Sequence, residues 1–177
     1  GAGKSTLLNI LTGVISPSVG SVEVNGKVAA LLELGAGFQP EFSGIDNVRM
    51  KAALLGMNAR ELDNRMDEIL SFADIGDYVH EPVKHYSSGM VVRLGFAVVA
   101  ASEPDLLITA EVLAVGDESF QKKCIRWIER FLEGDNTLIM VSHSMYQVQK
   151  RCQKSVWIHD GKTRKLGDVF PLTQSYL

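Results

Sequence analysis

Gly1-Ala2-Gly3-Lys4-Ser5-Thr6 opens the chain, and a short helical pattern follows over residues 4–13. The six residues match the latter part of the phosphate-loop motif G-x-x-x-x-G-K-[ST], in which glycines let backbone N–H groups approach phosphate oxygens. The helix that follows would point its positive end at the same phosphates. In such a loop Lys4 would neutralise the β- and γ-phosphates, and Ser5 would ligate Mg²⁺. The competing interpretation is a glycine-rich turn that happens to precede Lys-Ser.

A phosphate loop lies between a strand that aims it and a helix that follows it. The helix pattern is present, but the sequence begins inside the loop itself. We therefore expect the chain to be a fragment whose domain has lost its N-terminal part.

The composition is that of an ordinary globular chain. Its 177 residues suit one α/β domain, with 46% hydrophobic and 22% charged residues. The formal net charge of -3 gives no bulk attraction to nucleic acid or anionic lipid, so we expect no nucleic-acid partner. Cys124 and Cys152 suit free thiols better than a disulfide framework. No apolar run approaches the ~20 residues that a membrane-spanning helix needs, so any work at a membrane would require another subunit.

Strand patterns alternate with helix patterns along the chain, which predicts an α/β fold with a mostly parallel sheet flanked by helices. Charges mix with leucines and methionines at helical spacing from residue 45 to about 74, which indicates an inserted helical segment. Ligands of such sheets bind at the carboxyl ends of the strands. The pattern predicts strands at 20–26, 28–34, 106–108, 137–142, 155–159 and 162–166, and helices at 88–100, at 119–133, from about 144 and at the C-terminus.

A second candidate anion site is Ser87-Ser88-Gly89-Met90, at the start of the predicted helix 88–100. Ser87 suits a helix N-cap, and Gly89 exposes a backbone N–H in the first turn. Taken alone, these residues are better explained by plain helix capping.

Polar residues also follow two buried strands. Glu111 comes after the strand 106–108, where it could polarise an attacking water, and Asp117 lies six residues further on. His143 follows the strand 137–142 and could hydrogen-bond a γ-phosphate. A lone histidine at a strand end is more often a structural residue than a catalyst.

The order of these segments is specific, and in this order the chain resembles the nucleotide-binding subunit of an ABC transporter over essentially its whole length. Gln39, after the glycine-rich break Gly35-Ala36-Gly37, resembles the Q-loop glutamine. In the same comparison residues 1–6 resemble the Walker A loop, 87–90 the signature usually written L-S-G-G-Q, 106–111 Walker B, Asp117 the D-loop aspartate and His143 the H-loop histidine.

This resemblance implies a P-loop NTPase ABC ATPase domain over residues 1–177, with a helical subdomain at about 45–103. Its part from 45 to 83 would touch a membrane subunit, and Gln39 would link that part to the γ-phosphate. ATP and Mg²⁺ are the implied cofactors. The implied catalytic residues are Glu111, His143 and Lys4, the implied nucleotide contacts are Gly1, Ala2, Gly3, Lys4, Ser5, Thr6, Gln39, Ser87, Ser88, Gly89 and Asp117, and the implied metal ligands are Ser5 and Gln39.

A narrower resemblance lies in the amino-acid sequence of three stretches: LLELGAGFQPEFSG at 31–44, YSSGM at 86–90 and EVLAVGD at 111–117. They are similar to bacterial exporters of O-antigen, capsule and teichoic acid. This implies a homodimer of ATPase subunits on a dimeric transmembrane permease, at the cytoplasmic face of the bacterial inner membrane. Two ATP molecules would lie between the Walker A of one subunit and the signature of the other, and the substrate would be a lipid-linked glycan.

Ala110 departs from the family pattern, which has aspartate immediately before the Walker B glutamate. The missing carboxylate would help to hold the Mg²⁺ shell, so we expect ATP binding to survive and hydrolysis to suffer. Two other functions stay open: an ATP-binding module with impaired hydrolysis, and a soluble ABC ATPase that acts outside transport. Ala110 favours the first. The short helical insertion and the negative net charge disfavour the second.

Overall fold

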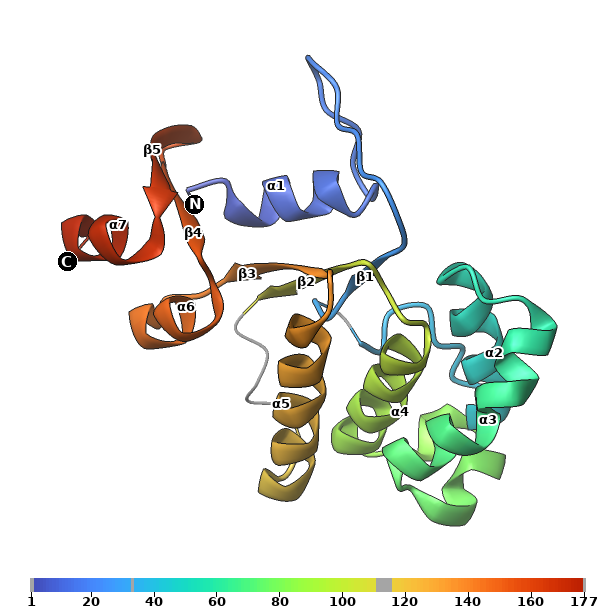
Figure 1. The fold of residues 1–177 in the computed structure, drawn as a ribbon. Coiled ribbons are helices and arrows are strands. Elements are labelled where there is room, and N and C mark those ends of the chain that lie inside the picture. The colour runs from blue at the N-terminus through green and yellow to red at the C-terminus, as the bar shows by residue number, and fades with distance from the viewer. Residues whose placement is uncertain (1, 33, 111–115, 177) are drawn as a thin grey trace.

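β2 (Leu106–Ala110) is the middle strand of a three-stranded parallel sheet in the computed structural model, which describes residues 2–32, 34–110 and 116–176. β1 (Val28–Ala30) and β3 (Thr137–Val141) flank it, with Val28 opposite Leu106 and Thr137 on the other side of the same residue. All three strands therefore end at one edge of the sheet (Figure 1). The parallel sheet of an α/β fold, predicted from the sequence, is confirmed.

Helices cover both faces of this sheet. Leu8 of α1 (Lys4–Leu11) packs on Leu106 and Ile108 at one face. Leu107 points to the opposite face, because successive strand residues alternate, and is buried with Phe96 of α4 (Ser88–Ala101). α5 (Glu118–Glu133) packs beside α4 on that face. The apolar residues of β2 thus serve two cores, which explains why nearly the whole strand is buried.

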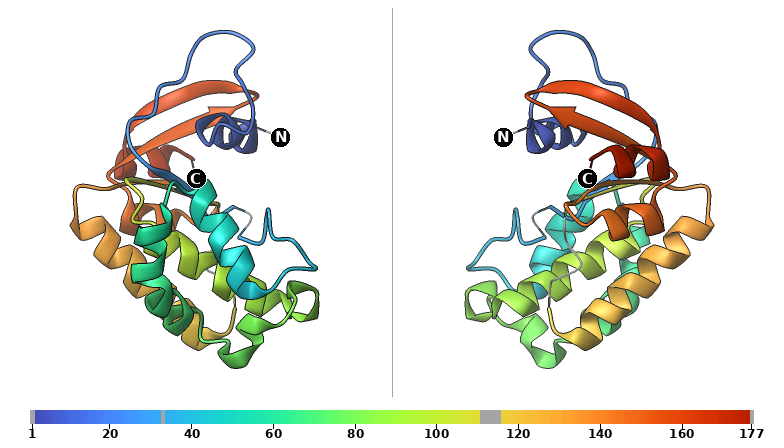
Figure 2. Two further views of the ribbon diagram at one scale, coloured as in Figure 1. Left: turned by 90° about the vertical axis from the view of Figure 1, so that its right-hand side faces the viewer. Right: turned by 90° about the vertical axis from the view of Figure 1, so that its left-hand side faces the viewer.

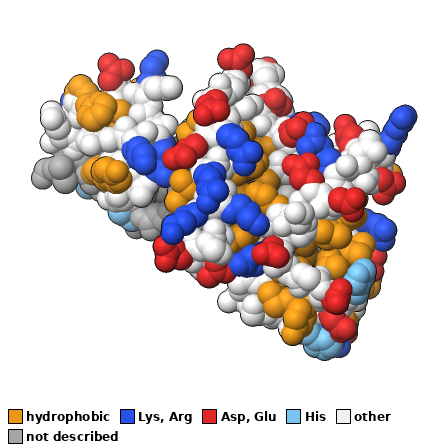
Figure 3. Space-filling model, turned by 60° about the horizontal axis from the view of Figure 1, so that its bottom comes forward, with side chains coloured by type: hydrophobic (Ala, Val, Ile, Leu, Met, Phe, Trp, Pro, Cys, Tyr) orange, Lys and Arg blue, Asp and Glu red, His pale blue; other side chains and the backbone are white. Residues whose placement is uncertain are grey.

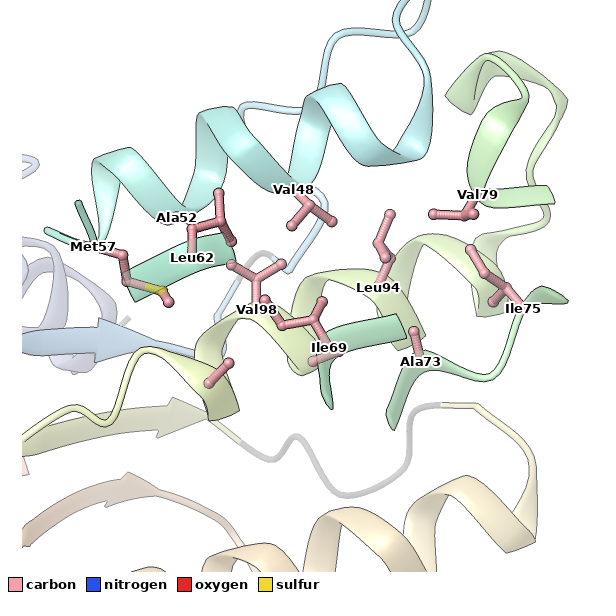
Figure 4. Close-up of a cluster of buried hydrophobic side chains, with 12 residues drawn as sticks. Val48, Ala52, Met57, Leu62, Ile69, Ala73, Ile75, Val79, Leu94 and Val98 are labelled. Atoms are coloured by element: carbon pink, nitrogen blue, oxygen red, sulfur yellow. The ribbon is translucent and has the colours of Figure 1, made fainter. Parts of the chain in front are cut away.

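The helices α2 (Gly44–Leu54) and α3 (Ala59–Ala73) form a separate core with α4. Figure 4 shows the side chains of Val48 and Val98 pointing into this core, and both are fully buried. Asn58 and Glu61 close the N-terminus of α3 with a reciprocal capping box. Two 3-10 turns, η1 (Gly76–His80) and η2 (Val83–His85), lead from α3 into α4. The predicted helical segment is confirmed, whereas its division into a subdomain at 45–103 stays a prediction.

The C-terminal part of the chain adds α6 (Met145–Arg151), the antiparallel hairpin of β4 (Lys154–His159) and β5 (Lys162–Asp168), and α7 (Val169–Tyr176). The hairpin turn lies against the start of the chain, where the N–H of Gly161 donates to the carbonyl of Ala2 at 3.2 Å. Figure 2 shows this hairpin next to α1. No helix of the described ranges is long and apolar enough to cross a bilayer.

The strand predicted at 20–26 is wrong: these residues form no ladder with any strand in the described part of the chain, and Val22 is exposed. Alternating residues favour a strand only when a neighbouring strand takes their hydrogen bonds. The strand predicted at 28–34 is real but ends at Ala30, although the N–H of Leu31 still donates to Ile108 at 2.8 Å. The apolar pattern continues past Ala30 because Leu31 and Leu34 are buried against α4, although they are not part of the strand.

Both cysteines are free, as predicted. Burial raises the pKa of Cys124 to about 12, so this core thiol stays protonated.

Candidate functional site

The first turn of α1 is built to receive an anion. Gly3 precedes it with φ +91 and ψ 6, a left-handed conformation that glycine adopts without strain. A glycine at this position supplies no side chain to accept from the N–H groups of the turn, and the turn carries no acidic residue. Lys4 brings a positive charge, and the side chains of Ser5 and Thr6 are exposed. Free N–H groups at a helix start favour a phosphate group, so these residues fit the phosphates of ATP. Gly1 lies outside the described residues.

The start of α4 differs in one respect from that of α1. Ser87 caps the helix, and its hydroxyl oxygen accepts from the N–H of Met90 at 3.2 Å. The capping role that the sequence suggests is therefore confirmed. Ser88 is exposed and Gly89 is half-buried, so two residues of the turn stay open to a ligand from outside the chain.

The ends of β2 and β3 lie side by side, because Ala110 and Val141 are partners in the ladder. His143 is exposed and follows β3 by two residues. Glu111 follows β2 directly but lies outside the described residues, so its side chain is not placed. The N-terminal end of α1 lies on this side of the sheet in Figure 1. The fold therefore brings the Walker A-like turn to the edge of the sheet at which β2 and β3 end.

Asp117 is the N-cap of α5, where its carboxylate accepts from the hydroxyl of Ser119 at 2.6 Å and from the N–H of Phe120 at 3.0 Å. The guanidinium of Arg93 also donates to it. The hydrogen bonds from Ser119, Arg93 and Phe120 hold the pKa of Asp117 well below its usual range. The carboxylate is therefore ionised at neutral pH, and through Arg93 it ties α5 to α4.

Arg93 is a site residue that the motif analysis missed. Its guanidinium lies 4.8 Å from the centre of the Phe120 ring and donates to the carbonyl of Ala73 at 3.3 Å. It thereby joins the C-terminus of α3, the middle of α4 and the start of α5. A signal was present in the sequence, since Arg93 is the one charge in an apolar helix and a charge in such a place needs partners.

Gln39 has an exposed side chain and a fixed backbone. Its N–H donates to Oδ1 of Asn47 at 2.6 Å, and its carbonyl accepts from Nδ2 of the same side chain at 3.0 Å. Asn47 is 1% exposed. The motif analysis missed this asparagine too, because a sequence pattern does not show which polar residue is buried.

The described residues contain no group of three or more His, Cys, Asp or Glu side chains placed to hold a metal ion. Mg²⁺ binds through few protein groups and keeps several waters. The exposed hydroxyl of Ser5 therefore fits a ligand of Mg²⁺ beside a bound phosphate. Ala110 packs with the apolar cluster around Leu8 and Ile108 and offers no oxygen.

The two candidate anion sites are not brought together within one chain. α1 lies on one face of the sheet, and α4 lies on the opposite face. α4 also runs toward the sheet, so Ser87 is at its far end (Figure 1). One copy of the chain therefore cannot place the turn at Lys4 and the turn at Ser88 on the same nucleotide.

Comparison with known proteins identifies the family of the chain. The family model described as "ABC transporter" matches residues 1–114. The chain is 46% identical to the O-antigen export system ATP-binding protein RfbB of Klebsiella pneumoniae, over 99% of this chain and 72% of that protein. It is 43% identical to the teichoic acids export ATP-binding protein TagH of Levilactobacillus brevis, over 99% of this chain and 48% of that protein.

Solved structures show the same fold at lower sequence identity. The ATP-binding subunit of an ABC transporter superposes with a TM-score of 0.82 at 20% identity, over 99% of this chain and 78% of that one. A dimeric ATP-binding cassette in a post-hydrolysis state with ADP and Pi superposes with a TM-score of 0.74 at 18% identity, over 95% of this chain and 81% of that one. The chain therefore belongs to the ABC transporter family, and its fold is that of an ABC ATPase domain.

Proposed function

We propose that the chain is the ATP-hydrolysing part of an ABC exporter that moves a lipid-linked surface polysaccharide across the bacterial inner membrane. Its identity to the ATP-binding proteins of O-antigen and teichoic acid export supports this substrate class. The ATPase would act at the cytoplasmic face, bound to a transmembrane permease dimer.

The observation that carries the proposal is the separation of the two anion-binding helix starts. Each copy offers an open turn at Lys4 on one face of the sheet and another at Ser88 at the far end of the other face. Two copies related by a two-fold axis would place the Lys4 turn of one copy and the Ser88 turn of the other at each nucleotide. The working unit is then a homodimer with two ATP molecules. The dimeric cassette of similar fold supports this arrangement.

Each residue at the edge of the sheet then has a role. The backbone of residues 1–3 and the ammonium of Lys4 would hold the β- and γ-phosphates, with Thr6 beside them. Ser5 and Gln39 would ligate Mg²⁺, which neutralises part of the phosphate charge when bound. Glu111 would orient or deprotonate the attacking water, and His143 would hydrogen-bond the γ-phosphate.

Glu111→Gln tests the hydrolytic role. The amide keeps the shape of the side chain but is a far weaker base, so we expect ATP binding to persist and phosphate release to stop. Binding is measured by equilibrium titration with nucleotide, and turnover by phosphate release at saturating Mg²⁺-ATP. Hydrolysis at the parent rate in this variant would reject the role of Glu111.

Residues 45–83 would form the surface that docks on the permease. Exposed apolar side chains in this segment are Leu54 at the end of α2 and Tyr78 on η1, and exposed Phe42 adjoins the segment in the loop before α2. Figure 3, which brings the lower ends of the helices in Figure 1 forward, shows hydrophobic side chains gathered beside histidines on this side. Apolar side chains that gather on a surface mark interaction sites.

Crosslinking to the permease tests this surface. A photo-reactive residue at position 42 or 78 should crosslink to the membrane subunit in assembled complexes. The same residue at Gln121 on α5 serves as the control and should give no product. Crosslinks confined to α5 would show that the docking surface is elsewhere.

Ala110 supports the alternative of an ATP-binding module with slow hydrolysis. Ala110→Asp would add an oxygen at the end of β2, where it could support the Mg²⁺ shell through water. We expect turnover at saturating Mg²⁺-ATP to rise, while the affinity for ATP changes little. Equal turnover with alanine and aspartate at this position would exclude Ala110 as the cause of slow hydrolysis.

The transport role is separated from a soluble ABC function by reconstitution. The chain, its permease and a lipid-linked glycan are placed in vesicles with ATP on the ATPase side. ATP-dependent movement of the glycan to the other leaflet, absent with Lys4→Ala, is the expected result. ATP hydrolysis without association with any membrane subunit would favour the soluble alternative.

A further inference from the structure

Asn47 uses its whole side chain on the loop that carries Gln39. Its Oδ1 accepts from the N–H of Gln39 at 2.6 Å, and its Nδ2 donates to the Gln39 carbonyl at 3.0 Å. The same nitrogen faces the carbonyls of Phe42 at 3.1 Å and Ser43 at 2.9 Å. With 1% of its surface exposed, Asn47 has no competition from water. One side chain thus holds the first residue and the last two residues of the loop 39–43.

The other side of this loop is held by the segment that leads to α4. The N–H of Lys84 donates to the Pro40 carbonyl at 2.9 Å, and the N–H of Val83 donates to Phe42 at 3.0 Å. The ammonium of Lys84 pairs with Glu41 at 2.7 Å. These contacts fix residues 40–42. The Gln39 carbonyl also accepts from the N–H of Phe42 at 3.1 Å, whereas the hydrogen bond described for the Gln39 N–H is the one to Asn47.

We propose that Asn47 is a positioning residue for Gln39, and that it sets where the Gln39 side chain stands relative to the nucleotide. The inference rests on the proposed role of Gln39 in binding Mg²⁺ and the γ-phosphate. A backbone held at both its N–H and its carbonyl gives the Cα–Cβ bond one direction, so the exposed amide of Gln39 samples a narrow region. Without Asn47, the Gln39 N–H loses its acceptor while the carbonyl keeps the bond from Phe42, so the Gln39 backbone is held less tightly.

Because Asn47 lies on α2, it couples the position of that helix to the position of the Gln39 backbone. The asparagine is near the start of a helix that lies within the segment 45–83 proposed to dock on the permease. A displacement of α2 would therefore move the Gln39 backbone with it, through hydrogen bonds and not through an apolar contact. Lys51 of the same helix donates to the carbonyl of Leu34 at 2.7 Å and ties α2 to the segment before Gln39, but among the described contacts of α2 only those of Asn47 reach Gln39 itself.

Hydrogen exchange tests the contact directly. In Asn47→Ala the Gln39 amide should exchange about tenfold faster, as expected for the loss of one well-made hydrogen bond. The amide of Lys84, held by Pro40, is the internal reference and should change little. Asn47→Ser is the second variant, because a serine hydroxyl can still donate to the carbonyl four residues earlier, at Ser43, but cannot reach Gln39. It keeps the test open if the alanine variant folds poorly.

Turnover tests the consequence, in the parent and in the Ala110→Asp background. A misplaced site residue lowers kcat, so we expect Asn47→Ala and Asn47→Ser to lower kcat by roughly 10- to 100-fold with a much smaller change in KM for ATP. Asn58→Ala is the matched control. This substitution breaks the capping box of α3 in the same group of helices and leaves the contacts of the loop 39–43 in place. It should lower the melting temperature while kcat stays at the parent value.

The Gln39→Ala background separates positioning from general destabilisation. If Asn47 acts through Gln39, adding Asn47→Ala to Gln39→Ala leaves kcat unchanged. A further fall in the double variant, or an equal fall in Asn58→Ala, would overturn the inference. If Gln39→Ala itself keeps the parent kcat, the proposed role of Gln39 fails and the inference falls with it. If Gln39→Ala lowers kcat and the Asn47 variants do not, the inference alone is wrong.

Discussion

Thr109 is a buried polar residue in β2, next to the end of the strand that leads to Glu111. It is 1% exposed, and its hydroxyl has no hydrogen-bond partner among the described residues. Thr173 of α7 is as deeply buried, but its hydroxyl donates to the carbonyl of Val169 at 2.8 Å. The two threonines make a matched pair, because the same substitution removes an unsatisfied group at one and a satisfied group at the other.

Thr109→Val should therefore raise the free energy of unfolding by about 1 kcal/mol, because a buried hydroxyl without a partner costs roughly 1–3 kcal/mol. Thr173→Val should lower the free energy of unfolding by a similar amount, about 1 kcal/mol. Urea denaturation of both variants checks the pair. A loss of stability in Thr109→Val as large as that in Thr173→Val would show that the Thr109 hydroxyl is bonded.

Asp117 makes stability depend on pH. Its pKa is lowered in the folded chain by Ser119, Arg93 and Phe120, so its contribution is fully present above the unfolded pKa of about 3.9. That contribution is lost as the pH falls through the lower pKa of the folded state. Asp117→Asn keeps a capping side chain and removes the charge. We expect the stability difference between parent and variant to be larger at pH 7 than at pH 3, by thermal denaturation at both values. A difference that stays constant would mean that the charge of Asp117 contributes nothing.

Helix α4 approaches the neighbouring backbone closely at one glycine. A Cβ on Gly95 would lie 2.3 Å from the carbonyl oxygen of Leu34, which is backbone and cannot rotate away. A Cβ on Gly89, in the first turn of the same helix, would meet the hydroxyl of Ser87 at 3.8 Å, an ordinary contact distance. The spacing between α4 and the segment before Gln39 therefore depends on the missing side chain at Gly95.

Gly95→Ala should lower the free energy of unfolding by about 1–3 kcal/mol, since an extra methyl group in a filled core forces the backbone to shift. Gly89→Ala should leave it unchanged or raise it by up to about 1 kcal/mol, because alanine is the better helix former. Chemical denaturation of the two variants measures the difference. Equal stabilities for the two alanine variants would contradict the close approach at Gly95.

Elements with a strong pattern could be predicted from the sequence, and elements that depend on a neighbour could not. The helices α3 and α5 carry apolar residues at helical spacing: α3 lies inside the helical segment expected at 45–74, and α5 begins one residue before its expected start. The segment 20–26 alternates like a strand but has no partner strand among the described residues, so its pattern misled. Hydrophobic periodicity records which side chains are buried, and it does not record which backbone groups pair.

The candidate site divides in the same way. Ser87 and Asp117 could be placed at helix starts because N-caps have short, local sequence rules. Arg93 stands out as the one charge in an apolar helix, but its partner Asp117 is 24 positions away and no local pattern shows that pairing. Asn47 gives no such signal, and its partner Gln39 is 8 positions away.

At the scale of the whole molecule, the account depends on a site shared between two copies. The Walker A-like turn of α1 and the signature turn of α4 belong to opposite faces of one sheet. In the proposed function one copy would hold the phosphates at Lys4, and a second copy would bring Ser88 to them. ATP binding should therefore promote dimerisation of the chain.

Sedimentation of Glu111→Gln with and without ATP tests this claim most directly. The account predicts the mass of one copy without nucleotide and of two copies with Mg²⁺-ATP. Adding Ser88→Glu should return the mass to one copy while ATP still binds, because a carboxylate at the helix start repels the phosphates of the partner's nucleotide. Ser71→Glu, at an exposed serine of α3, should leave the ATP-dependent dimer intact. A dimer that forms without ATP, or one that persists with Ser88→Glu, would contradict the shared site.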